Sequence, residues 1–207
     1  AWAADSAGNR KDSIIMLGMG GGIHPASIMA APARVAVILG DLTVGIDAGS
    51  ADSSQTSGTS KSTATYTNQG LNARYFFGNS FNASLGYHMR NWTIESTSTV
   101  TTSTYGGSGF TTSIASETYS LDAKSTVATI GIGNHWLLDW GLWIGGDWVL
   151  ASSALSQTKE VTSTGTTGSP SAAQQASFKK NAEAAADEMN AWSASGGFAV
   201  FTIGFAF

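Results

Sequence analysis

The chain has 207 residues, of which only 12% are charged, and its formal net charge is −4. A soluble domain usually carries roughly 25% charged residues, whereas polarity here comes mainly from serine, threonine, glycine and asparagine. The negative balance argues against nucleic acid as a partner. The absence of cysteine excludes disulfides and thiolate metal sites. No run of 18 apolar residues exists, so a transmembrane helix is excluded as well.

The first half of the chain alternates apolar residues with small or polar ones. A period of two is typical of a strand whose two faces meet different surroundings. The clearest case is a hairpin in which residues 71–77 and 81–90 flank a short turn at 78–80. Residues 33–39 are less clear, because Val35 to Leu39 form an unbroken apolar run. The alternation predicts strands at 13–22, 33–39, 42–48, 71–77 and 81–90.

The second half of the chain contains a change of phase. The apolar series from Tyr119 to Ala123 and the series from Ala128 to Ile132 have opposite parity. We therefore expect a β-bulge between residues 124 and 127. A turn is expected at 133–137, followed by a strand at 138–151.

Residues 153–195 break the strand pattern. Their first half reads as a loop rich in serine, threonine and glycine, after which Ser169 and Pro170 suit an N-cap and a first helical position. The spacing that follows predicts a helix at about 171–192. Its apolar stripe must cover something, either the protein's own rim, a second copy or another protein. The stripe comprises Phe178, Ala182, Ala185, Met189 and Trp192.

Short turns and long loops alternate strictly along the chain. This order places every short turn at one end of a sheet and every long loop at the other, as in bacterial membrane barrels. It predicts an all-β fold, an eight-stranded antiparallel transmembrane β-barrel with one helix in the last extracellular loop. The short turns are at 40–41, 78–80 and 133–137, and the long loops are at 23–32, 51–62, 96–112 and 153–195. Residues 1–12 would be a periplasmic segment and residues 13–207 a single barrel domain. The threonine-rich loop 96–112 is β-prone, so part of it is expected to extend the flanking strands.

The last segment, GGFAVFTIGFAF, alternates large apolar residues with smaller ones. With the strand count, this ending resembles that of small eight-stranded bacterial outer-membrane barrels, broadly of the OmpA and OmpW kind. The resemblance implies an outer-membrane location in a Gram-negative bacterium. It also implies that Phe201, Ile203, Phe205 and Phe207 form the C-terminal signal that the barrel-assembly machinery reads.

Several charged residues share the parity of the predicted inner face. An eight-stranded barrel is only wide enough for side chains to fill, and buried charges must pair. We therefore expect a polar plug, with a narrow path for small solutes as the alternative. The plug residues are Asp47, Arg74, His88, Arg90, Asp139 and Asp147. The three histidines, His24, His88 and His135, are spread over a loop, a strand and a turn, so neither a metal site nor a cofactor is expected.

These features favour a non-enzymatic barrel with a structural or surface-interaction role. The alternatives are a narrow porin-like channel and, less favoured, a lipid-modifying enzyme in which His24 and Ser27 would be the candidates. Small outward residues would let neighbouring barrels approach closely, so a homo-oligomer that organises or encloses lipid is also considered. Those residues are Ala48, Ala73, Ala83 and Gly146. The expected partners are outer-membrane lipid, the assembly machinery and further copies of the chain.

Overall fold

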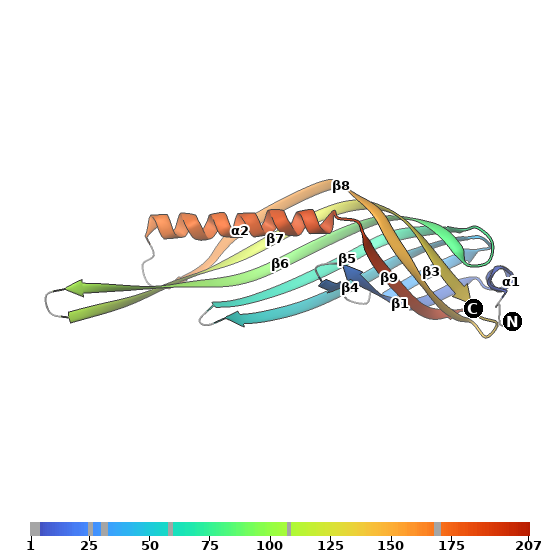
Figure 1. The fold of residues 1–207 in the computed structure, drawn as a ribbon, viewed down its shortest axis with the longest axis horizontal. Coiled ribbons are helices and arrows are strands. Elements are labelled where there is room, and N and C mark those ends of the chain that lie inside the picture. Colours follow the sequence, from blue (N-terminus) through green and yellow to red (C-terminus); the bar gives the residue numbers. More distant parts are fainter. Residues whose placement is uncertain (1–4, 25–26, 30–32, 58–59, 107–108, 168–170) are drawn as a thin grey trace.

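Eight antiparallel strands close into a ring in the computed structural model (Figure 1). The structure describes residues 5–24, 27–29, 33–57, 60–106, 109–167 and 171–207. The ring strands are β1 (Ile15–His24), β3 (Ala33–Leu39), β4 (Leu42–Ser57), β5 (Ser60–Phe76), β6 (Phe81–Gly106), β7 (Gly109–Leu137), β8 (Leu142–Thr167) and β9 (Phe198–Ala206). A short strand, β2 (Ser27–Met29), pairs with the end of β1. Two helices, α1 (Ser6–Asp12) and α2 (Ala172–Ser193), complete the chain.

Pairing of β1 with β9 closes the ring, from Met16 opposite Ala206 to Ile23 opposite Ala199. Every other neighbour in the ring is also a neighbour in sequence, which makes this an up-and-down barrel. Helix α1 and the C-terminal residue Phe207 lie at the end that carries the short connections 40–41, 77–80 and 138–141, here called the turn end (Figure 1).

Residues 33–39 show how the alternation works in the ring. Arg34, Ala36 and Ile38 point inward and are buried, whereas Val35 and its odd-numbered neighbours are exposed on the outside. The unbroken apolar run is therefore a strand whose outer face contacts the surroundings and whose inner face contacts other side chains. The strand prediction at 33–39 is confirmed.

Two of the expected connections, 51–62 and the first half of 153–195, are largely strands instead, and the extension of the strands expected within 96–112 is confirmed. β4 and β5 stay paired up to Ser57 opposite Ser60, so the predicted loop at 51–62 is wrong. Residues 96–106 belong to β6 and 109–137 to β7, and β8 runs on to Thr167. Threonine and serine in these segments continue the ladder because β-branched residues suit a pleated backbone. The extended parts of β6, β7 and β8, residues 91–106, 109–126 and 156–167, form a projection that we call the arm (Figure 1).

The turn predicted at 133–137 is also wrong, because β7 continues through it and the chain turns at 138–141. Gly133 is not a turn residue. A Cβ there would overlap Asp147, so glycine allows close approach of the inner side chain from β8. The true turn has Gly141 at φ 90°, a left-handed conformation that favours glycine.

The change of phase in β7 has a different cause from the predicted bulge. Leu121 and Ala123 share the inward face with Val127 and Gly131, so β7 keeps one parity throughout. The irregularities between β7 and β8 place the extra residues in β8, for example Leu155. On the turn-end side of the irregularity at Leu155 the apolar residues of β7, such as Ile130 and Ile132, face outward. On the arm side, Leu121 and Ala123 face inward. The change of phase in the sequence therefore marks the point where the apolar face of β7 switches from the outside of the ring to the inside.

Helix α2 covers the inward apolar face of the arm (Figure 1). Ala186 is 0% exposed and packs against Leu121 and Ala123 of β7. Side chains of the predicted stripe, Ala185 and Met189, join the same cluster, as do Trp92, Ile94 and Val161. Of the remaining stripe residues, Phe178, Ala182 and Trp192 are half-buried.

The helix begins at a capping box. The Ser171 hydroxyl accepts from Gln174 N, and the Gln174 side chain accepts from Ser171 N at 2.8 Å. Ser169 and Pro170, the predicted start signal, lie outside the described residues, and Ser171 is the N-cap. In the described chain, neither helix is long and apolar enough to cross a membrane.

Packing of Ala186 predicts a direct test of the helix position. Ala186→Glu places a carboxylate in the apolar contact with Leu121, so α2 should separate from the arm. Trypsin should then cut at Lys179 and Lys180 about tenfold faster, which mass spectrometry of timed digests would measure. Ala184→Glu, at an exposed position on the same helix, should leave the rate unchanged. Equal rates for both variants would contradict this packing.

Candidate functional site in the barrel interior

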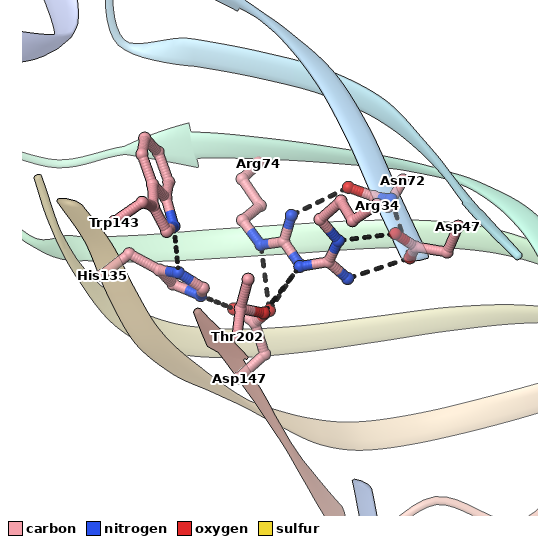
Figure 2. Close-up of polar contacts among 8 residues, drawn as sticks. All are labelled: Arg34, Asp47, Asn72, Arg74, His135, Trp143, Asp147 and Thr202. Carbon is pink, nitrogen blue, oxygen red and sulfur yellow. Dashed lines mark hydrogen bonds and ion pairs between the residues drawn. The ribbon is translucent and has the colours of Figure 1, made fainter. Parts of the chain in front are cut away.

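A bidentate ion pair joins β3 to β4 inside the ring. Arg34 Nε donates to Asp47 Oδ1 at 2.5 Å, and Arg34 Nη2 donates to Asp47 Oδ2 at 2.9 Å (Figure 2). The two residues are direct cross-strand partners, and both side chains are 4% exposed. Two parallel charge-assisted bonds fix the geometry of this pair more tightly than a point contact would.

A second ion pair spans the ring from β5 to β8. Arg74 Nη2 and Nε donate to Asp147 Oδ2 at 2.6 and 2.9 Å. Asn72 links the two pairs, because its amide donates to Asp47 at 2.9 Å and its oxygen accepts from Arg74 at 2.8 Å. Two positive and two negative charges thus form one connected and balanced network (Figure 2).

The network continues to an aromatic pair on β7 and β8. Trp143 Nε1 donates to His135 Nδ1 at 2.8 Å, so that nitrogen must be the acceptor. His135 Nε2 lies 3.0 Å from Asp147 Oδ1 and therefore carries the proton that Asp147 accepts. The indole thus selects one tautomer of the neutral imidazole. Gly145 allows this arrangement, since a Cβ there would overlap the His135 ring.

The turn end of the interior is closed by apolar side chains and by α1. Phe76, Leu137 and Trp143 are buried in one cluster with Met16, Ala36, Ile38 and Ala206. Below them, Ser6 of α1 donates to Leu137 O at 3.2 Å and accepts from Leu137 N at 3.0 Å. The helix therefore fills the base of the ring.

Arg10 anchors α1 to the turns. Its guanidinium donates to Asn79 O at 2.6 Å and to Gly78 O at 2.8 Å, and it lies 4.0 Å from the centre of the Phe76 ring. Burial lowers the pKa of Arg10, while the Asp41 carboxylate acts in the opposite direction. Residues 1–12 were expected only as a segment. The missed signal is Asp5, whose carboxylate caps the helix by accepting from Gly8 N at 3.0 Å.

Beyond the network, towards the arm, the interior opens into a cavity of about 90 Å³. Arg34, Arg74 and the two aspartates line its floor. Tyr66, His88 and Arg90 lie on its far side. The His88 ring lies flat over two glycines of adjacent strands, and a Cβ at Gly70 or Gly86 would overlap it.

The predicted plug residues fall into three groups. Asp47, Arg74 and Asp147 belong to the network, whereas His88 and Arg90 line the cavity above it. Asp139 is not in the interior: it is exposed next to the turn and accepts from Asn9 Nδ2 of α1 at 3.0 Å. Asp139 lies outside the interior because the chain turns at 138–141 and not at the predicted 133–137.

The prediction did not include Arg34, His135 or Thr202, whose hydroxyl accepts from Arg34 Nη1 at 2.9 Å. Arg34 had a usable signal, because it shares parity with Ala36 and Ile38 in a strand that was recognised. His135 was hidden by the misplaced turn.

The remaining predicted residues lie on the surface or outside the described side chains. Phe201, Ile203 and Phe205 are exposed on the outer face of β9, and Phe207 follows them with the same orientation. His24 and Ser27 lie in β1 and β2, but their side chains are outside the described part of the chain.

Comparison with known proteins leaves the fold as the main guide: no family model matches the chain, and no curated protein is detectably similar to it. Within the described residues, no group of three or more histidine, aspartate or glutamate side chains is placed to hold a metal ion.

The ion-pair network predicts a specific pattern of stability. Arg74→Met leaves Asp147 buried without its arginine, which should lower the free energy of unfolding by about 3–5 kcal/mol. Arg74→Met with Asp147→Asn removes both charges and should lose clearly less. Urea titrations followed by tryptophan fluorescence in one detergent would measure both.

Asp139→Asn is the matched control for this series, because Asp139 is exposed and its Oδ1 acceptor is retained. Its effect should stay within about 0.5 kcal/mol. A double variant as unstable as Arg74→Met alone would show that the uncompensated charge is not the cause.

Proposed function

We propose that the chain spans the bacterial outer membrane as a closed, non-conducting and non-enzymatic barrel, and that it has a structural or surface-interaction role. The observation that carries this proposal is a belt of exposed apolar side chains around a closed ring. Leu85 is 62% exposed, and Leu71, Ile46 and Ile203 are each more than half exposed. Contiguous apolar surface of this extent is uncommon on water-soluble monomers, and hydrocarbon is the environment that suits it.

The belt has the height that a bilayer requires. On β6 the outward apolar residues run from Phe81 to Met89, which matches the roughly 9–11 residues of a membrane-spanning strand. The next outward residues are Asn91 and Thr93. Aromatic residues mark both borders, as expected at lipid interfaces. They are Tyr75, Phe77, Phe81, Trp136 and Trp140 at the turn end and Tyr87 and Trp148 towards the arm.

The arm supports a role at the cell surface. β7 is 29 residues long, which corresponds to roughly 95 Å at 3.3 Å per residue, well beyond a hydrocarbon core of about 30 Å. Above the belt its outward residues include Lys124 and Asp122, so the arm suits water. With the turn end in the periplasm, the arm and α2 would project outward from the cell.

The filled interior favours a plug over the alternative, a narrow porin-like channel. From the turn end inward, α1, the apolar cluster around Phe76 and the ion-pair network follow one another along the barrel axis. The cavity favours the channel, but it ends at the network.

Self-association within the membrane is a further part of the proposal. Ala48, Ala73 and Ala83 place small side chains on the outer face of the belt. A second barrel could therefore approach closely there and organise or enclose lipid. Gly146 fits this idea less well, because a Cβ there would lie 3.4 Å from the Phe201 ring of its own chain. The C-terminal residues Phe201 to Phe207 would serve as the signal for the assembly machinery.

Membrane insertion predicts different effects for arginine at two outward positions. Leu85→Arg places a charge at the middle of the belt and should lower the free energy of folding into lipid vesicles by about 2–4 kcal/mol. Thr162→Arg, outward on β8 in the arm, should have little effect. Urea titrations in phosphatidylcholine vesicles, followed by tryptophan fluorescence, would compare the two. Equal effects would contradict the proposed position of the belt.

The filled interior predicts that the barrel does not conduct ions. The wild-type chain in planar bilayers should give no stable unitary openings, although vesicle flotation shows that it is inserted. Openings of uniform size from the native but not the heat-denatured protein would favour the channel instead. Hydrolysis or transfer of phospholipid acyl chains by the inserted protein would contradict the non-enzymatic role.

A further inference from the structure

The cavity above the ion-pair network carries an excess of positive charge. Its described lining contains three arginines, Arg34, Arg74 and Arg90, but only two aspartates, Asp47 and Asp147. The floor residues pair with one another. Arg90 is 5% exposed, so its charge is poorly screened by water and acts strongly across a small space. The field in this cavity therefore favours an anion.

Buried polar atoms at the same place lack acceptors or donors. Tyr66 is 5% exposed, and its hydroxyl has no hydrogen-bond partner among the described residues. The same holds for His88 Nδ1. Leaving such groups unsatisfied is costly, and a ligand with several acceptor oxygens would satisfy a hydroxyl donor directly.

Arg90 is placed to join them. It pairs with Asn68 of β5, two residues from Tyr66, and it is two residues from His88 on β6, so the three side chains line the same part of the cavity. A guanidinium has five N–H donors in a planar fork, so Arg90 can donate to a bound oxyanion in addition to its other contacts.

Two glycines maintain the space. Because the His88 imidazole lies flat over Gly70 and Gly86, it leaves the centre of the barrel open at this point. A methyl group at Gly86 would overlap both the His88 ring and Thr129 Oγ1. A volume of about 90 Å³ limits a ligand to a few heavy atoms.

We propose that this cavity binds one small oxyanion, of the size of inorganic phosphate or a short carboxylate, through Arg90, Tyr66 and His88. The site is independent of the barrel's role in the membrane, because it is formed by the interior of one folded chain. Its failure would leave the results on insertion and conductance unaffected.

Equilibrium dialysis of the full chain in detergent would test the site. Radiolabelled inorganic phosphate and, in parallel, radiolabelled acetate are the probes, with chloride keeping the ionic strength constant. One saturable site per chain is expected for at least one probe, and the better probe identifies the anion. Absence of saturable binding for both would overturn the proposal and assign the cavity to water.

Three variants locate the site. Tyr66→Phe removes one hydroxyl oxygen and should raise the dissociation constant about tenfold, and Arg90→Gln should raise it further. Lys124→Gln removes the same charge from an exposed position on β7, one residue from the cross-strand partner of Arg90, and should leave binding unchanged. Equal losses for Lys124→Gln and Arg90→Gln would overturn the site, since overall charge alone would then explain binding.

Folding is checked for each variant by the mobility of unheated and heated samples on gels. If Arg90→Gln does not fold, Tyr66→Phe decides the question. Gly86→Ala gives an independent measurement, because its methyl group would push the overlying His88 ring into the cavity without changing charge. A folded Gly86→Ala protein should bind neither probe, and undiminished binding would overturn the location.

Discussion

Closure of the sheet between β1 and β9 is the constraint on which the rest of the structure depends. Eight continuous pairings connect these strands, and Phe207 extends them by donating to Ile15 O at 2.9 Å. A closed ring leaves no edge strand whose N–H and C=O groups need other partners. This is the condition for placing a sheet in hydrocarbon. The last strand, β9, is paired on both sides, with β8 and with β1.

Closure in turn determines what the interior must contain. An eight-stranded ring encloses only enough space for side chains, so the inner face needs glycines where bulky groups cross and paired charges where polar groups are buried. Gly145 beneath His135 illustrates the first requirement. The second is met by two arginine–aspartate pairs that Asn72 connects. These pairs fix relative positions across the ring, and their burial makes the loss of a single partner costly.

Much of this was predictable from the period of two, but its failures share one physical origin. The ring, its antiparallel order and the helix before the last strand followed from alternation and helical spacing. The predicted orientation of the side chains, however, required apolar residues to face outward along the whole length of each strand. Leu121 and Ala123 contradict this, because above the belt the outside is polar and the inside is covered by α2. Glycine was likewise read as a turn signal at Gly133, where it serves close packing, and this error displaced Asp139 and hid His135. Neither the surroundings of a strand nor the reason for a glycine can be read from local sequence.

The reversal of polarity explains why α2 is where it is. An arm built from the extended β6, β7 and β8 would expose Leu121, Ile94 and Val161 on its inner face, and three strands alone have no second layer to cover them. The helix supplies that layer, and Lys159 holds it through Asp187 at 2.7 Å. The chain then returns to the ring through Gly197, which has φ 82° and donates to Val149 O at 2.7 Å. Because β9 follows directly and completes the closure with β1, the segment that covers the arm is continuous with the segment that closes the barrel. The helix that covers the arm is therefore followed, after Gly197, by the strand that carries Thr202 and pairs with the Asp147 strand β8.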